Sequence, residues 1–122
     1  MTWTVIFAPA FEKEFEQLHT AVQDELLAQA MVIEMFGPSA KRPRVDTLKG
    51  SKFSNMKELR FDAEDGVWRV AFAFDPHRNA VLLAAGDKSG ASERRFYRQL
   101  IAHADRRFKT HLDQTSRPAR QK

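Results

Sequence analysis

The sequence predicts an α+β domain in the order β-αα-βββ-α, with an antiparallel-rich sheet and helices packed on one face. Three observations lead to this prediction. Between residues 9 and 36, apolar residues recur every three or four positions in two runs, which is the period of a helix. Residues 56–86 contain three strand-like runs separated by short turns, and residues 93–112 return to the helical period. A chain of 122 residues can bury one core of this kind.

The first part of the chain predicts a strand followed by a helical hairpin. Residues 2–8 alternate well enough for a strand, and Pro9 suits the first turn of a helix. Thr20 is expected to cap a second helix, which the Gly-Pro pair at 37–38 ends. The apolar stripes of the two helices are Phe11, Phe15 and Leu18, and Val22, Leu26, Ala30 and Ile33.

The second part predicts a long connection, three strands and a final helix. Residues 37–55 are expected to form a loop, which is unusually long for a compact domain unless it has a function. Strands are expected at 56–61, 67–75 and 80–86. Ser92 is a plausible N-cap for the last helix, whose stripe is Phe96, Leu100, Ala104, Phe108 and Leu112. Residues 1–113 are expected to form one domain, and 114–122 a disordered basic tail.

Composition excludes several classes of site. Without cysteine there is no disulfide framework and no thiolate zinc site. No apolar run approaches the roughly 20 residues of a membrane span, and no leader pattern begins the chain, so a cytoplasmic protein is expected. Neither a Ser-His-Asp arrangement nor a paired-carboxylate site is visible. The four histidines, which lack a metal-ligand spacing and are interpreted as structural or solvated, are His19, His77, His103 and His111. No metal and no small-molecule cofactor are expected.

The net charge of +4 is divided into blocks of opposite sign. Residues 1–40 carry six acids and one lysine, whereas residues 41–60 carry seven Lys or Arg and two acids. Residues 61–93 are acidic again, and residues 94–122 carry nine basic residues against two acids. Two basic blocks of this kind favour a phosphate-rich partner, and a solvated basic surface is the alternative.

The strands carry charge on the side away from the predicted helices. In VWRVAFAF, alternation places Arg69 with Ala71 and Ala73 on the face that the helices leave uncovered, and Arg60 belongs to the same face. Small residues leave a concavity, and guanidinium groups match phosphate oxygens. This interpretation requires both arginines to lie exposed. The alternative is a solvated face with a cross-strand pair between an arginine and Glu58.

The stretch AAGDKSGASERRFYRQL adds candidates at the edge of this face. Lys88 follows the last strand, between two glycines. The cations Arg94, Arg95 and Arg98 lie in the first turns of the last helix, where they oppose its dipole unless an anion is bound. Tyr97 either presents its hydroxyl to the site or packs as a half-buried side chain.

These residues resemble the RelE/ParE toxin superfamily, and are most similar to its HigB-like, phage-derived branch. The resemblance rests on LKG…MKELRF…GVWRVAFAFD and AVLLAAGDKSG…RRFYRQLIAHADRRF, and it covers residues 2–113. It implies a RelE-like fold and a type II toxin–antitoxin toxin. Many members are ribosome-dependent endoribonucleases, in which the 2′-hydroxyl attacks its own phosphate and a cyclic phosphate results. ParE-type members inhibit gyrase without nuclease activity, and an inactive nucleic-acid-binding phage remnant is a further alternative.

The resemblance also implies partners and residue roles. A helix-turn-helix antitoxin (HigA-like), the ribosome and mRNA are the expected partners, with no membrane involved. The expected catalytic residues, matched to the family's strand and helix positions, are Arg60, Arg69, Lys88 and Tyr97. The residues expected to bind RNA are Lys49, Lys52, Lys57 and Arg94. The chain departs from RelE in having Glu58 where RelE has a lysine, and in a longer segment before the last helix.

Overall fold

The computed structural model describes residues 2–90 and 92–116, which form one five-stranded sheet and three α-helices. The strand order is β1-β5-β4-β3-β2, and only the β1–β5 pair is parallel. The α+β fold class and the element order are therefore confirmed, with one strand more than expected. The elements are β1 (Thr4–Phe7), α1 (Pro9–Glu16), α2 (Thr20–Phe36), η1 (Gly37–Ser39), β2 (Val45–Thr47), β3 (Met56–Ala63), β4 (Gly66–Phe74), β5 (Asn79–Asp87) and α3 (Glu93–Thr115).

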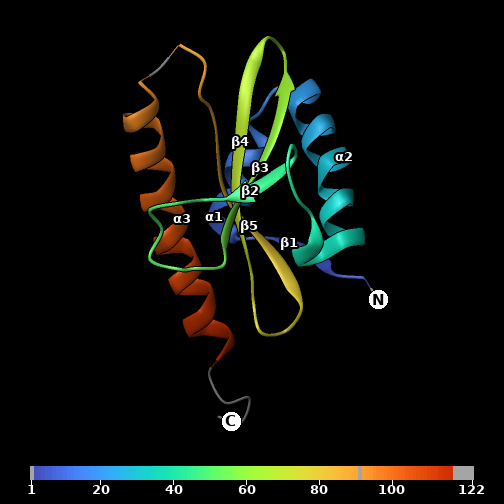
Figure 1. Cartoon of the computed structure of the whole chain (residues 1–122), viewed down its shortest axis with the longest axis vertical. Helices are drawn as coiled ribbons and strands as arrows, with labels where there is room; N and C mark the ends of the chain where they lie inside the picture. Colours follow the sequence, from blue (N-terminus) through green and yellow to red (C-terminus); the bar gives the residue numbers. More distant parts are fainter. Residues whose placement is uncertain (1, 91, 117–122) are drawn as a thin grey trace.

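Helices lie on both sides of the sheet, which differs from the one-sided packing that the sequence predicts. In Figure 1, α3 and α2 stand on opposite sides of the strands. The face expected to be uncovered is buried, because Ala71 and Ala73 of β4 have no exposed surface. Ala71 pairs with Ala84 of β5, so small side chains form the floor beneath α3. The alanines thus allow a helix to approach closely, and they do not form a concavity.

The connection between α2 and β3 contains a strand that the sequence does not reveal. β2 pairs antiparallel with β3 and places Val45 opposite Leu59 and Asp46 opposite Glu58. Val45 is buried, whereas the rest of the connection from 41 to 44 is exposed. Three residues are too few to show a strand period, so the pairing is set by tertiary contact.

The helix ends are partly as predicted. Ser92 caps α3, accepting a hydrogen bond from the backbone N–H of Arg95. The N-cap of α2 is His19 and not Thr20, because the Nδ1 atom of His19 accepts from the Ala21 N–H. Gly37 ends α2 as expected, with a φ of 52° that favours glycine. Gln114 and Thr115 continue α3 and do not begin a disordered tail; residues 117–122 lie outside the described residues.

The helices differ in how much apolar surface they carry and expose. In the described part of the chain, no helix is long and apolar enough to cross a membrane. On the outer side of α2, large apolar side chains are exposed, namely Leu27, Met31, Met35 and Phe36.

Candidate active site

A cavity of about 320 Å³ lies where β2 and β3 meet the first turns of α3. The β2–β3 register puts Asp46 beside Glu58 on one face, and Arg60 follows two residues later on the same face. Lys88, one residue beyond β5, contributes a further cation. The residues that line the cavity are Arg42, Asp46, Thr47, Leu48, Lys49, Glu58, Arg60, Lys88, Glu93 and Tyr97. Positive charge and one buried carboxylate therefore converge on the same space.

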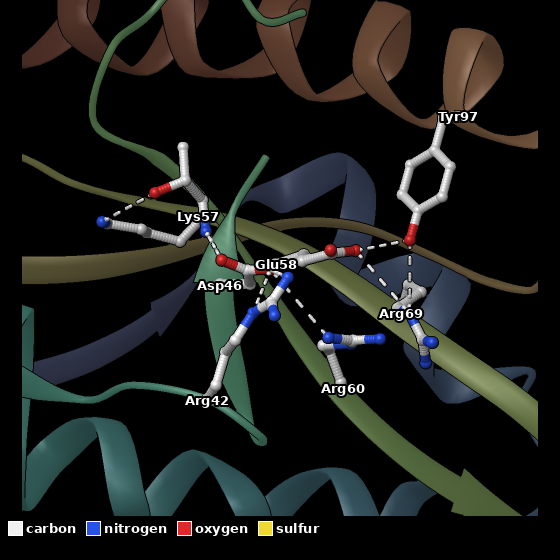
Figure 2. A network of polar contacts seen from close by, with 8 residues as sticks. Arg42, Asp46, Lys57, Glu58, Arg60, Arg69 and Tyr97 are labelled. Atoms are coloured by element: carbon white, nitrogen blue, oxygen red, sulfur yellow. Dashed lines mark hydrogen bonds and ion pairs between the residues drawn. The ribbon is translucent and has the colours of Figure 1, made fainter. Parts of the chain in front are cut away.

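A hydrogen-bonded cluster forms one wall of this cavity. The Tyr97 hydroxyl donates to Oε1 of Glu58 at 2.8 Å and accepts from Nε of Arg69 at 3.3 Å, as Figure 2 shows. The Arg69 Nε atom lies 3.7 Å from the same Glu58 oxygen, and its Nη1 donates to the Trp68 carbonyl. Glu58 is 7% exposed and Arg69 6% exposed. The phenol, carboxylate and guanidinium thus hold one another in place at the edge of the core.

The environment of Tyr97 fixes its protonation state. Burial raises the pKa of the Tyr97 hydroxyl, and its hydrogen bond to Glu58 raises that pKa further, while Arg69 acts in the opposite direction. Because the pKa is raised, the phenol is protonated near neutral pH. Tyr97 is therefore a proton donor at this site, and Glu58 is the group that accepts from it.

A second ion-pair group lies on the β2 side. Arg42 contacts Asp46 through Nε and Nη2, both at 2.9 Å, and Nη1 of Arg60 lies 3.9 Å from the same carboxylate. The hydrogen bond from Arg42 lowers the pKa of Asp46, against a smaller opposing effect of burial. Arg60 and Arg69 are direct cross-strand partners, yet each is matched to a different carboxylate. Figure 2 shows the ion pair of Arg60 with Asp46 and that of Arg69 with Glu58.

Arg69 is not placed as the sequence predicts. It was expected on an uncovered face, ready to contact phosphate, and the structure buries it under α3. The reason is that the small residues beside it admit α3, whose Tyr97 then reaches the guanidinium. The structure does bring four of the predicted residues together, because they line one cavity: Lys49, Arg60, Lys88 and Tyr97.

The other residues predicted to bind RNA lie elsewhere. Lys57 points to the opposite side of β3 from Glu58, with its Nζ 3.5 Å from the Thr47 hydroxyl. Lys52 belongs to a separate groove beside α3. Arg94 is exposed on the first turn of α3 and is not among the residues that line the cavity.

Two residues of the site were missed as functional candidates. Glu58 was considered only as a partner for an arginine, and Arg42 lay in an apparent loop. The pairing of β2 with β3 places both residues at the cavity. The only sign of this pairing in the sequence is the apolar Val45, whose partner Leu59 is buried. In the described ranges, 2–90 and 92–116, no three His, Cys, Asp or Glu residues are grouped so that they could hold a metal ion.

The fold defines the class of protein. The chain is similar to a double-arginine mutant of the E. coli toxin RelE in the free state, with a TM-score of 0.55 and 13% identity, covering 84% of this chain and 96% of that one. It is also similar to the archaeal RelE–RelB complex from Pyrococcus horikoshii, with a TM-score of 0.53 and 20% identity, covering 75% of this chain and all of that one. At these identities the likeness shows the fold alone, which is that of RelE.

The sequence comparisons give the family. Residues 13–109 match the family described as "Phage derived protein Gp49-like (DUF891)". HigB3, a candidate toxin of Mycobacterium tuberculosis, is 41% identical over 108 residues, which are 88% of this chain and 92% of HigB3. HigB2 of the same organism, also a candidate toxin, is 42% identical over 100 residues, which are 80% of this chain but 49% of HigB2. The chain belongs to the Gp49-like phage-derived family, is related in sequence to HigB3 and has the RelE fold.

Proposed function

We propose that this chain is the toxin of a type II toxin–antitoxin module and cleaves mRNA on the ribosome. The single observation that carries the proposal is the Glu58–Tyr97 hydrogen bond at the wall of a cavity lined by cations. Cleavage through the 2′-hydroxyl requires a proton acceptor, a proton donor and positive charge beside the phosphate. The cavity contains side chains for each of these roles.

We assign the two proton transfers of this reaction to Glu58 and Tyr97. Glu58 accepts the 2′-hydroxyl proton as O2′ bonds to phosphorus. Tyr97 donates its proton to O5′ as the P–O5′ bond breaks, which leaves a 2′,3′-cyclic phosphate and a 5′-hydroxyl. The proton on Glu58 then passes to the Tyr97 oxygen along their 2.8 Å hydrogen bond, which restores both groups. These steps account for every proton that moves, and they require no metal or co-reactant.

The cations divide into two roles in this mechanism. Lys88, Arg60 and Lys49 line the cavity and stabilise the crowded anionic phosphate. Arg69 does not line it, and we assign it a positioning role: it holds the Tyr97 oxygen through Nε and balances the Glu58 charge. The burial of Arg69 is also the observation that favours the alternative, a ParE-type gyrase inhibitor that needs no phosphate-cleaving arginine.

The proposed partners follow from the same module. We expect a helix-turn-helix antitoxin (HigA-like) that reduces toxicity, and the ribosome with bound mRNA as the target. An acidic antitoxin segment is expected to cover the cavity, because Arg42 and Arg60 share the single carboxylate of Asp46. Lys49 and Lys88 form no ion pair among the described residues. A cytoplasmic location follows from these partners.

Induction in cells, followed by mapping of mRNA 5′ ends and a parallel assay of DNA supercoiling, tests the proposal. We expect new 5′ ends inside translated messages and unchanged supercoiling. Tyr97→Phe is expected to reduce cleavage about 100-fold or more, because general acid catalysis is worth 10²–10⁴. Lys57→Gln, outside the cavity, serves as the matched control and is expected to cleave normally. Relaxed or broken DNA without mRNA cuts would establish the gyrase alternative instead.

A further inference from the structure

The segment from Gly50 to Phe53 crosses α3 and forms a groove with it. In Figure 1 the connection between β2 and β3 extends across α3. The groove has a volume of about 630 Å³ and lies beside the helix, with Gly50, Lys52 and Phe53 on one side. It shares no lining residue with the cavity of the candidate active site. It is therefore a second concave surface, separate from the proposed chemistry.

Hydrogen bonds fix the loop that forms this wall. The carboxylate of Asp105 accepts from the Ser51 hydroxyl with one oxygen and from the Lys52 N–H, at 2.9 Å, with the other. The Ser51 oxygen accepts in turn from the Phe53 N–H at 3.0 Å. The Phe53 ring packs edge-on against Phe108 of the core, with centroids 5.0 Å apart. The groove is consequently preformed, which lowers the entropic cost of filling it.

The groove combines an apolar floor with a basic rim. Phe53, Ile101 and Ala102 supply the apolar floor. The rim carries Lys52, Arg98, Arg106 and Lys109, all of them exposed. Asp105 is the one acid among the lining residues, and both of its oxygens are already engaged with the loop. Lys109 is paired with Asp113 at 3.0 Å, whereas Lys52, Arg98 and Arg106 form no ion pair among the described residues. The surface therefore presents apolar area and uncompensated positive charge together.

We propose that this groove binds an acidic amphipathic segment of another polypeptide. Such a segment places apolar side chains on the floor and carboxylates against the four rim cations, which is the anatomy of a protein–protein contact. An RNA strand fits less well, because a phosphate set against the apolar floor loses its hydration without gaining a donor. From Arg98 to Lys109 the helix rises on the order of 16 Å, so about three turns of a partner helix match the groove.

Peptide binding to the full chain tests this proposal. The probe is a fluorescein-labelled 12-residue peptide of Leu, Ala and Glu, with leucines on one helical face and glutamates on both sides of it. The two comparison probes are a peptide of the same composition in scrambled order and a 12-nucleotide single-stranded RNA. We expect the amphipathic peptide to bind at least tenfold more tightly than the scrambled peptide, with an affinity that falls as salt rises.

Variants locate the binding. Ala102→Asp places a carboxylate on the floor at an exposed position, and Arg106→Glu with Lys109→Glu reverses the rim. Each is expected to weaken peptide binding at least tenfold. Arg95→Glu makes the same kind of charge reversal on α3 outside the groove and is expected to change it less than threefold. Unchanged thermal midpoints show that the variants fold.

The outcomes separate this proposal from that of mRNA cleavage. Equal binding of both peptides, or no loss in Ala102→Asp, overturns the peptide groove. RNA binding that is lost in the rim variant, without peptide binding, reassigns the groove to nucleic acid and overturns the proposal. The groove variants leave Glu58 and Tyr97 intact, so they are expected to retain mRNA cleavage in induced cells. Failure of cleavage in the unmodified chain would count only against the proposed function.

Discussion

At the scale of single residues, the two arginines on β3 and β4 show how neighbours decide a role. Arg60 and Arg69 are cross-strand partners, and like charges placed opposite each other destabilise a sheet. Each is therefore matched to its own carboxylate, Arg60 to Asp46 near solvent and Arg69 to Glu58 in the interior. The exposed pair contributes little stability, whereas the buried pair is costly to break.

Arg69→Ala is expected to lower the free energy of unfolding by roughly 3 kcal/mol, because Glu58 is left as an uncompensated charge in the interior. Chemical denaturation measures this loss. The control is Arg60→Ala, whose partner lies at 3.9 Å and whose side chain is 32% exposed; it is expected to cost less than about 1 kcal/mol.

The double variant Glu58→Gln with Arg69→Met is expected to recover most of the lost stability, since it removes both charges. A stable Arg69→Ala protein would contradict this account of the ion pair. Loss of toxicity in Arg69→Ala alone therefore says little about chemistry, and the Tyr97→Phe variant is the sharper test of catalysis.

At the scale of elements, periodicity predicted most of the fold and missed the parts set by tertiary contact. The stripes of α2 and α3 and the alternation in β4 were sufficient for element type and order. β2 has three residues and no period, so its pairing and the placing of Asp46 beside Glu58 were not predicted. The second covered face was also missed, because Ala71 and Ala73 are as consistent with a concavity as with a close-packed helix.

The end of α3 is fastened to the β4–β5 turn by a buried carboxylate. Asp75 accepts from the backbone N–H groups of His77 and Asn79, and from Nδ2 of Asn79. Its Oδ2 also lies 2.8 Å from Nε2 of His111 on α3. Burial alone would raise the pKa of Asp75, but the hydrogen bonds from His111 and Asn79 outweigh it, so the pKa is lowered.

Asp75→Asn is expected to destabilise the protein by about 2 kcal/mol at pH 7, because a charged acceptor is lost. A carboxyl group whose pKa is lowered by folding stabilises the protein above its unfolded pKa of about 3.9. This contribution is lost as pH falls through the lower folded value. The stability gap between wild type and variant, measured by urea denaturation from pH 7 downward, should therefore narrow as the pH falls below about 4.

Asp113→Asn is the matched control, since Asp113 forms an exposed ion pair with Lys109 on the same helix. It is expected to change stability by less than about 0.5 kcal/mol at any pH in this range. A gap for Asp75→Asn that stays constant on acidification would show that the carboxylate charge does not fasten α3.

At the scale of the whole molecule, the basic residues are distributed over separate surfaces. The cations that line the cavity are Arg42, Lys49, Arg60 and Lys88, and those that line the groove are Lys52, Arg98, Arg106 and Lys109. Lys57 lines a third hollow, which adjoins the cavity at Arg42 and Asp46. The block of charge at 41–60 was interpreted as one continuous surface for a polyanion, but strand alternation and the β2–β3 connection divide it. Charge counted along the chain shows how many cations exist, and only the fold shows which of them act together.

This division predicts which cations an RNA strand engages. With the Tyr97→Phe chain, in which cleavage is expected to be about 100-fold slower or more, binding of a 12-nucleotide RNA is measured over a range of salt concentrations. Each cation that displaces a counterion from single-stranded RNA contributes about 0.7 to the slope of log K against log salt.

Lys88→Gln is expected to reduce the slope by about 0.7, because Lys88 lines the cavity. Arg94→Gln makes the same charge change on the exposed first turn of α3, outside the cavity, and is expected to leave the slope unchanged. Equal losses in the two variants would mean that the strand responds to total charge and not to the cavity, and the assignment of the active site would have to be withdrawn.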